Sequence, residues 1–185
     1  AYYGLTDRLK LGVEHIVENE PQEDWETETN ILNLTYNTTR QDEGYLLSTA
    51  IFGGYGFEDG DPDTLGLVLI AERDQGPFNI KANLGFKREI GGGRASGVEY
   101  DSALQIKYHW RKSFNPALEW HADYGHLHDT SPLDLQGHYV GPYFSGQLFE
   151  TASGQVKWGA GYFWGLTEGS ADNAQRVLLE YEFRF

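Results

Sequence analysis

The sequence of 185 residues contains no cysteine and no methionine. Without cysteine the chain cannot form a disulfide, present a thiolate nucleophile or ligate a metal through sulfur. It also has no run of about 18 apolar residues, which excludes a membrane-spanning helix. No segment has the charged and then apolar pattern of a signal peptide, so we expect a mature or trimmed chain. The length suits one domain over residues 1–185.

Basic residues are scarce, because 14 Lys and Arg stand against 28 Asp and Glu, and the formal net charge is -14. A nucleic-acid partner needs a basic footprint, so this balance argues against nucleic-acid binding. The acidic residues gather in two clusters, whose simplest interpretation is solvated loops. The clusters are Glu18, Glu20, Glu23, Asp24, Glu26 and Glu28, and then Glu58, Asp59, Asp61 and Asp63.

Within the second cluster, Asp59, Asp61 and Asp63 place three carboxylates two residues apart, as calcium-binding loops do. The glycine at the sixth position and the glutamate at the twelfth position of an EF-hand are missing. A further group, His126, His128 and Asp129, could bind a transition metal at the surface. We predict no specific metal site and no cofactor.

What the chain has in abundance is aromatic residues, at 15% of the total, and 23 glycines. Its last eleven residues alternate between apolar and charged side chains. Because successive side chains of a strand point to opposite sides, this segment predicts a strand with one apolar and one charged face. The apolar face carries Val177, Leu179, Tyr181, Phe183 and Phe185, and the other face carries Arg176, Glu180, Glu182 and Arg184.

The same alternation recurs along the chain and predicts an all-β protein of about ten strands. In two of these strands, 45–56 and 65–73, both faces are apolar, so the sequence does not assign their inner face. Short turns at 74–77 and 112–116 alternate with longer polar loops, as in an antiparallel up-and-down sheet. The predicted strands are 9–17, 26–37, 45–56, 65–73, 78–89, 98–111, 117–126, 136–148, 156–166 and 175–185.

A chain that ends on Phe185 after alternating aromatics resembles the closing strand of bacterial outer-membrane β-barrels. In that class the terminal aromatics, here Phe185, Phe183 and Tyr181, are read by the barrel-insertion machinery. The resemblance implies a monomeric transmembrane barrel in the outer membrane of a Gram-negative bacterium. Its apolar face would meet lipid and lipopolysaccharide, and its charged face would line a lumen. The short turns would be periplasmic, and the acidic loops would face outward and could bind divalent cations among lipopolysaccharide head groups.

A narrower resemblance lies near the start of the chain. The heptapeptide from Tyr3 to Leu9, YGLTDRL, resembles the periplasmic turn of a family of outer-membrane proteins assigned to the MetA pathway of phenol degradation. In that family the turn follows an earlier strand. By this resemblance residues 1–3 would be the end of such a strand, the natural barrel would have twelve strands, and the role would be associated with the uptake of aromatic compounds.

The inward face predicted from the alternation carries charges of both signs. Because a buried charge is tolerated when it is paired, these residues could pair across the barrel for purely structural reasons. They could equally line a porin-like, water-filled pore. Ten strands lie between filled eight-stranded barrels and open porins, which predicts a narrow channel or transport-associated protein for small solutes. The lumen-lining residues are Lys81, Lys87, Glu99, Asp101, Lys107, Arg111, Lys157, Arg176, Glu180, Glu182 and Arg184, together with Lys10 and Glu14.

Three hypotheses from different classes stand beside the channel. A hydrolase could use His121 and Asp123, with His109 and Glu119 nearby, because a histidine beside a carboxylate can act as a general base. This arrangement resembles omptin-type proteases, but the order of Asp and His differs and no second carboxylate pair stands on the opposite wall. The His-x-Ser motif of lipid A deacylases is also missing. The second hypothesis is a structural or adhesive barrel with acidic loops, and the third is a soluble lipocalin-like barrel with its apolar face inside.

Overall fold

The computed structural model describes residues 2–18, 26–57, 62–91, 97–151 and 154–183, with the backbone alone for 15–18, 26–29 and 182–183. These residues form β-strands and one short 3-10 helix, η1 (Gln41–Glu43). None of their helices is long and apolar enough to cross a membrane. The strands are β1 (Tyr2–Gly4), β2 (Leu9–Glu18), β3 (Glu26–Thr39), β4 (Ser48–Phe57), β5 (Asp63–Gln75), β6 (Phe78–Ile90), β7 (Glu99–Tyr108), β8 (Asn115–His126), β9 (Asp129–Thr130), β10 (Gly137–Thr151), β11 (Gly154–Gly165) and β12 (Asn173–Phe183).

All twelve strands belong to one antiparallel sheet with up-and-down topology. Each strand pairs with the next along the chain, except that β9 pairs only with β8, and β10 then follows β8 in the sheet. The ten long strands lie where the sequence predicts strands. The two short ones, β1 and β9, are additional to the predicted set.

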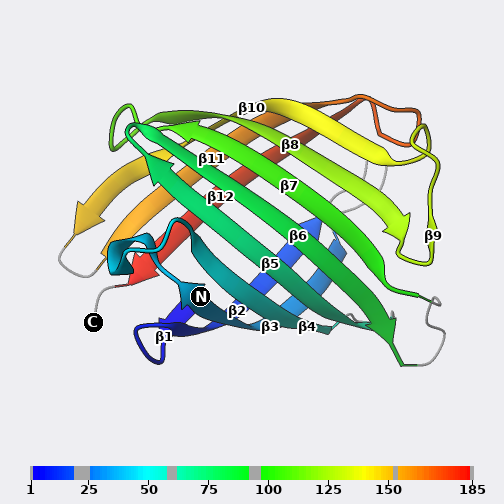
Figure 1. Cartoon of the computed structure of the whole chain (residues 1–185), viewed down its shortest axis with the longest axis horizontal. Coiled ribbons are helices and arrows are strands. Elements are labelled where there is room, and N and C mark those ends of the chain that lie inside the picture. The colour runs from blue at the N-terminus through cyan, green and yellow to red at the C-terminus, as the bar shows by residue number, and fades with distance from the viewer. Residues whose placement is uncertain (1, 19–25, 58–61, 92–96, 152–153, 184–185) are drawn as a thin grey trace.

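The connections differ between the two ends of the sheet (Figure 1). Short turns join β5 to β6 and β7 to β8 at one end, and the longer connections, including the segment with β9, lie at the other. In the β5–β6 turn, Gly76 has a φ of 59, a left-handed conformation that glycine adopts at little cost. The β3–β4 connection contains η1 and is held by ion pairs from Arg8 to Glu43 and from Arg40 to Asp42. The predicted alternation of short and long connections is followed in part. The β3–β4 connection, residues 40–47, is an exception, because it is long and lies beside the short β5–β6 turn, where Gln41 hydrogen-bonds to the backbone of Asp74.

The sheet is strongly curved but not closed. Among the described residues, β1 pairs only with β2 and β12 pairs only with β11. The curvature brings β12 over the same face as β8, because Arg176 of β12 contacts Glu119 of β8 across β10 and β11. The prediction of a sheet of antiparallel strands is confirmed, whereas closure into a barrel is not observed.

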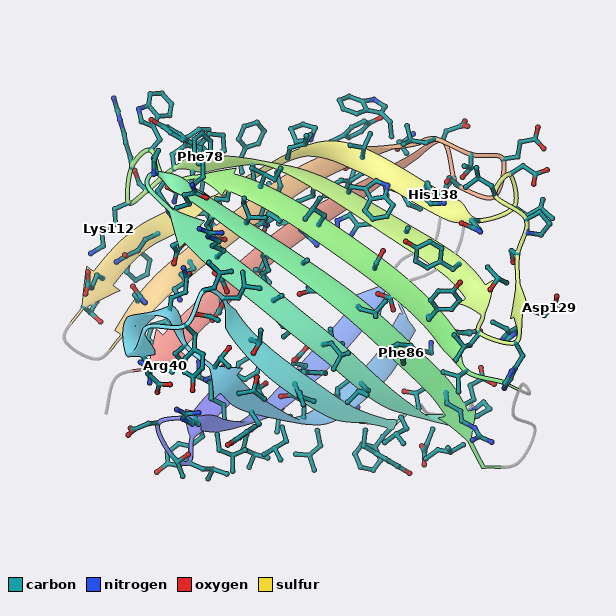
Figure 2. All side chains as sticks on the ribbon, viewed as in Figure 1. Arg40, Phe78, Phe86, Lys112, Asp129 and His138 are labelled. Atoms are coloured by element: carbon teal, nitrogen blue, oxygen red, sulfur yellow. The ribbon has the colours of Figure 1, made fainter. Side chains whose placement is uncertain are left out.

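The two faces of this curved sheet differ in polarity. Apolar side chains are exposed on the convex face and polar side chains are buried on the concave face, which is the reverse of the usual arrangement in a water-soluble protein. On β6 and β7, the convex face carries Phe78, which Figure 2 labels, and Leu104. These side chains are 45% and 38% exposed. The concave face carries polar side chains that are buried, such as Asn79 next to Phe78 and Glu119, which is 2% exposed. Buried apolar side chains among the described residues are limited to Ala122, Tyr143 and Phe163.

The convex face is continuous over most of the sheet. It includes large apolar side chains from nine of the long strands. They are Leu11, Val13, Leu32, Leu34, Tyr36, Ile51, Leu65, Leu67, Leu69, Phe78, Ile80, Leu84, Leu104, Ile106, Tyr108, Leu118, Tyr162, Trp164, Val177, Leu179 and Tyr181, all of them exposed.

Candidate functional site

The candidate site is a polar cluster on the concave face, where β7, β8, β10, β11 and β12 converge. Strand alternation places its members, since Gln105 on β7 stands directly opposite Glu119 on β8, and Glu119 stands opposite Gly141 on β10. His121 lies two residues beyond Glu119 and therefore on the same face. Arg176 comes from β12, opposite Gly161 of β11.

Glu119 is the centre of the cluster. Its carboxylate accepts hydrogen bonds from the side-chain amide of Gln105 and from the guanidinium of Arg176, and its Oε2 lies 2.9 Å from Nε2 of His121. Burying a carboxylate costs free energy unless it is paired with a positive charge and accepts hydrogen bonds. The three partners of Glu119 supply the charge and the hydrogen bonds. The cluster therefore holds one buried negative charge in a fixed position on the concave face.

Aromatic rings form the wall beside this ion pair. The guanidinium carbon of Arg176 lies 4.5 Å from the ring centre of Tyr143 and 5.5 Å from that of Phe163. The ring of His121 meets Phe163 edge to face at 5.1 Å. Glycines provide the space, because a Cβ on Gly159 would overlap the hydroxyl of Tyr143, and one on Gly161 would overlap both rings. The rings and the ion pair are therefore in contact with one another on the concave side of β8 to β12.

Two smaller hydrogen-bonded groups lie on the other half of the concave face. Asn33 of β3 donates to Oε1 of Glu14 at 2.6 Å, and the hydroxyl of Tyr2 donates to the same oxygen. Nδ2 of Asn79 donates to Oε1 of Glu72 at 2.5 Å and to Oδ1 of Asp74 at 2.8 Å.

Four other charged side chains of the concave face, Lys81, Lys107, Asp101 and Asp123, form no ion pair with another described residue. Asp101 and Asp123 stand directly opposite each other on β7 and β8, where two like charges repel. Charges arranged in this way require hydration, so the part of the concave face away from Arg176 suits contact with water.

Most of the predicted lumen residues lie on this concave face. Exceptions occur where the predicted strand 98–111 is too long, because β7 ends at Tyr108. His109 and Arg111 consequently lie in the β7–β8 turn, His109 with Nε2 3.8 Å from Asp74 and Arg111 with its guanidinium 4.9 Å from the ring of Trp110. The concave set is Lys10, Glu14, Lys81, Lys87, Glu99, Asp101, Lys107, Glu119, His121, Asp123, Lys157, Arg176 and Glu180.

Several residues of the sequence predictions lie wholly or partly outside the described residues. Arg184 and Phe185 are not described, and the side chains of Glu182 and Phe183 are not described although their backbone belongs to β12. Tyr181 lies exposed on the convex face. Of the three aspartates with calcium-loop spacing, Asp59 and Asp61 are not described, and Asp63 accepts a hydrogen bond from Tyr55 at 2.6 Å. The acidic cluster from Glu18 to Glu28 also falls on undescribed residues or side chains.

Asn33, Asn79, Tyr143 and Phe163 are members of the concave face that the sequence predictions do not single out. A signal for them is present, because Asn33 sits between the convex residues Leu32 and Leu34, and Phe163 sits between Tyr162 and Trp164. Aromatic rings at concave positions are the least expected, since the sequence pattern assigns aromatics to the lipid-facing side.

The structure brings two of the four enzyme candidates together, since Nε2 of His121 lies 2.9 Å from Oε2 of Glu119. Asp123 is not part of this contact and accepts a hydrogen bond from the backbone N–H of Gly125. Arg176 donates to the same oxygen of Glu119 that His121 contacts. No group of three or more His, Asp and Glu side chains that could hold a metal occurs among the described residues, which include His126, His128 and Asp129.

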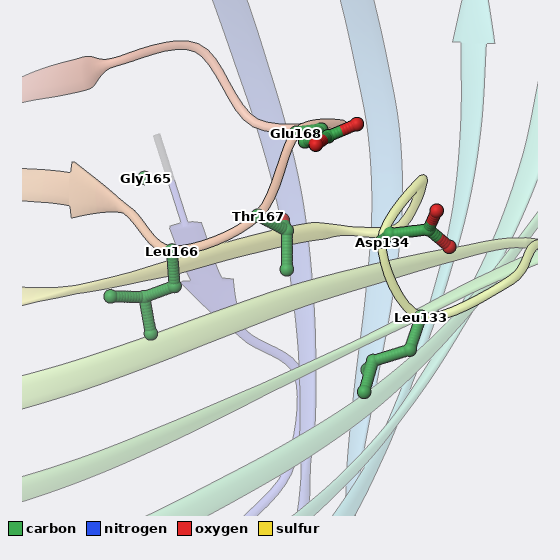
Figure 3. A pocket seen from close by; sticks show the side chains of 6 residues that line it. All are labelled: Leu133, Asp134, Gly165, Leu166, Thr167 and Glu168. Atoms are coloured by element: carbon green, nitrogen blue, oxygen red, sulfur yellow. The ribbon is translucent and has the colours of Figure 1, made fainter.

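An open cavity of about 660 Å³ lies at the loop end of the sheet, between the β9–β10 and β11–β12 connections (Figure 3). Its walls carry Leu133 and Leu166 beside Asp134 and Glu168. The two connections are joined by hydrogen bonds, one of them from the N–H of Gly169 to the carbonyl of Asp134 at 2.9 Å. The cavity is therefore an acidic recess in a fixed pair of loops at one end of the concave face.

Comparison with known proteins finds no matching family model, no matching curated protein and no matching solved structure. The fold and the concave site define the class of the protein as an all-β, up-and-down antiparallel sheet with a polar concave face.

Proposed function

We propose that this protein is an outer-membrane β-barrel that provides a narrow polar pathway for small solutes. The observation that carries the proposal is the inverted distribution of side chains, with exposed apolar residues on the convex face and buried polar residues on the concave face. Lipid stabilises such a convex face, while water and paired charges stabilise the concave one. In water the same surface would be an unusually large exposed apolar patch.

The accessible surface supports this proposal independently. It is 12205 Å², whereas a compact water-soluble monomer of 20.9 kDa exposes about 9,000 Å² by the usual scaling with mass. Exposed large apolar side chains of the convex face contribute to this excess. A membrane would cover the convex face and remove its apolar surface from water.

The cluster around Glu119 is the constriction of the proposed pathway. Arg176 reaches across β10 and β11 to Glu119, and Tyr143 and Phe163 fill the space beneath it. Passage is left to the other half of the concave face, which is lined by unpaired charges and by the small Gly66 and Gly85. The pathway is accordingly narrow, and its solutes are small and hydrated.

Single-channel recording in planar bilayers tests this function. The purified protein is expected to give discrete openings of small conductance, with a preference for cations because carboxylates outnumber cationic side chains on the concave face. Arg176→Ala removes the side chain that spans the constriction and is expected to enlarge the openings. Arg111→Ala, in the β7–β8 turn and away from the concave face, is the control and is expected to leave the opening size close to that of the wild type. A wild-type protein that inserts but never conducts contradicts the proposal.

A further inference from the structure

The acidic recess at the loop end of the sheet has no role in the pathway proposed above. It is the cavity of about 660 Å³ between the β9–β10 and β11–β12 connections. Small-molecule sites in proteins have volumes of about 300–1,000 Å³, so the acidic recess is large enough for a small ligand. The residues that line it are Leu133, Asp134, Gly165, Leu166, Thr167 and Glu168.

Hydrogen bonds between the two connections fix the walls of the acidic recess. The N–H of Gly169 donates to the carbonyl of Asp134 at 2.9 Å. The hydroxyl of Thr167 donates to the carbonyl of Gln136 at 2.5 Å. The packing is close, since an added Cβ on Gly169 would lie 2.2 Å from the carbonyl oxygen of Leu135. A ligand therefore meets walls that are already formed, and little conformational entropy is lost in ordering them.

Two carboxylates give the acidic recess its charge. Asp134 and Glu168 are exposed, and neither carboxylate forms an ion pair or hydrogen bond with any part of the chain that the structure describes. The other four lining residues carry no charge. With a net charge of -14, the field of the whole chain also attracts cations. Charge complementarity therefore favours a positively charged ligand.

Two leucines give the acidic recess an apolar part. Leu133 and Leu166 are 68% and 58% exposed, so the chain leaves most of their surface uncovered. In the view of Figure 3, the carboxylates of Asp134 and Glu168 extend to one side, and the leucine side chains extend away from them. An apolar group that covers the leucines would remove their surface from water. The ligand that fits is therefore charged at one end and apolar at the other.

We propose that the acidic recess binds a small organic cation, with its ammonium group toward Asp134 and Glu168 and its apolar body against Leu133 and Leu166. A bare metal ion is a poorer match, because it makes no use of the leucines and finds only two carboxylates in the lining. Binding of an organic cation does not depend on the proposed membrane function, because the two connections alone form the acidic recess.

Hexylammonium is a suitable probe, and hexanol, which has the same apolar chain without the charge, is its neutral counterpart. Isothermal titration calorimetry with the purified, folded protein measures both. Hexylammonium is expected to bind about fivefold more tightly than hexanol, the size expected for two exposed ion pairs, and high salt is expected to weaken its binding. Equal binding of the two compounds, or no binding of hexylammonium, overturns the proposal.

A double variant tests the two carboxylates. Asp134→Asn with Glu168→Gln is expected to lower the affinity for hexylammonium about fivefold. The matched control is Asp129→Asn with Asp172→Asn, which removes two exposed negative charges at the same end of the sheet and leaves the lining of the acidic recess unchanged. This control is expected to change the affinity little. Equal losses in the two double variants overturn the proposal, because the cation then responds to net charge alone.

A second double variant tests the apolar part. Leu133→Ala with Leu166→Ala is expected to weaken the binding of hexylammonium and to remove its preference over methylammonium, which lacks the apolar chain. Unchanged affinity for hexylammonium overturns the assignment of an organic cation. Circular dichroism verifies that each variant keeps the β-structure of the wild type. None of these measurements uses a bilayer, so their failure is distinguishable from failure of the single-channel test of the proposed membrane function.

Discussion

At the scale of single residues, Glu119 shows how the concave face tolerates charge. It contributes one carboxylate that is almost fully buried and that three side chains from β7, β8 and β12 approach. Arg176 is the only one of the three that always carries a positive charge, since guanidinium is not deprotonated in proteins. The positive charge of Arg176 therefore lowers the free-energy cost of burying the Glu119 carboxylate.

Replacing Arg176 by Met is accordingly expected to lower the free energy of unfolding by about 1–3 kcal/mol, which is below the range for a fully buried pair because the guanidinium is half-exposed. The second replacement, Glu119→Gln, is expected to recover part of the loss, because no unpaired charge is left buried. Urea unfolding in detergent micelles measures both. Arg111→Met in the β7–β8 turn is the control and should change stability little. Strict additivity of the Arg176 and Glu119 changes would show that the two side chains do not interact.

Gly159 is a second residue at which the structure leaves no room for a side chain. An added Cβ would overlap the hydroxyl and the ring of Tyr143, so Gly159→Ala is expected to cost about 1–3 kcal/mol through overpacking. Shortening the neighbour in a Gly159→Ala, Tyr143→Leu double variant should restore part of that loss. Gly53→Ala, where an added Cβ meets nothing within 4 Å, is the matched control. Thermal unfolding in detergent gives the melting temperatures of all three variants. Equal melting temperatures of Gly159→Ala and Gly53→Ala would refute the predicted overlap with Tyr143.

At the scale of strands, the membrane proposal predicts opposite responses from two adjacent positions of β7. Leu104 lies on the convex face and Ala103 on the concave face, opposite His121. Lysine at position 104 would enter the hydrocarbon near the middle of the strand and is expected to cost about 2–4 kcal/mol. Lysine at position 103 faces the hydrated side near Asp101 and should cost much less. Unfolding in lipid vesicles measures the difference, and equal costs at positions 103 and 104 would contradict the membrane proposal.

Strand patterns explain how much of the fold the sequence could predict. The alternation from Phe78 to Lys87 predicts β6 and its two faces, and the structure has both. It could not assign the faces of β4 and β5, where Phe52, Val68 and Ile70 are concave and Ile51 and Leu69 are convex, because all five are apolar. When both faces of a strand are apolar, the two-residue alternation cannot show which face is concave and which is convex.

The alternation of side chains also cannot predict the cluster around Glu119 on the concave face, but for a different reason. The pattern places Glu119 and Arg176 on the inward face, but they are 57 residues apart in the chain and belong to strands separated by two others. Their contact depends on the curvature of the sheet and on the room left by Gly159 and Gly161. Neither property can be read from either strand alone.

At the scale of the whole molecule, the balance of buried and exposed surface determines which solvent stabilises the fold. Three buried apolar side chains among the described residues do not form the hydrophobic core that a water-soluble domain of this size needs. Under the membrane proposal, lipid or detergent buries the convex face. Stability would then be a property of the sheet and its apolar surroundings together.

The solvent dependence of folding follows directly from that balance. Dilution of the urea-denatured protein into detergent micelles or lipid vesicles is expected to give a monomer rich in β-structure. Dilution into buffer alone should give aggregates, because the exposed leucines and aromatics of the convex face would associate. Circular dichroism with analytical ultracentrifugation measures structure and size in each case. A soluble barrel with its apolar face inside would instead fold as a monomer in buffer, and that single result would remove the basis of the proposed membrane function.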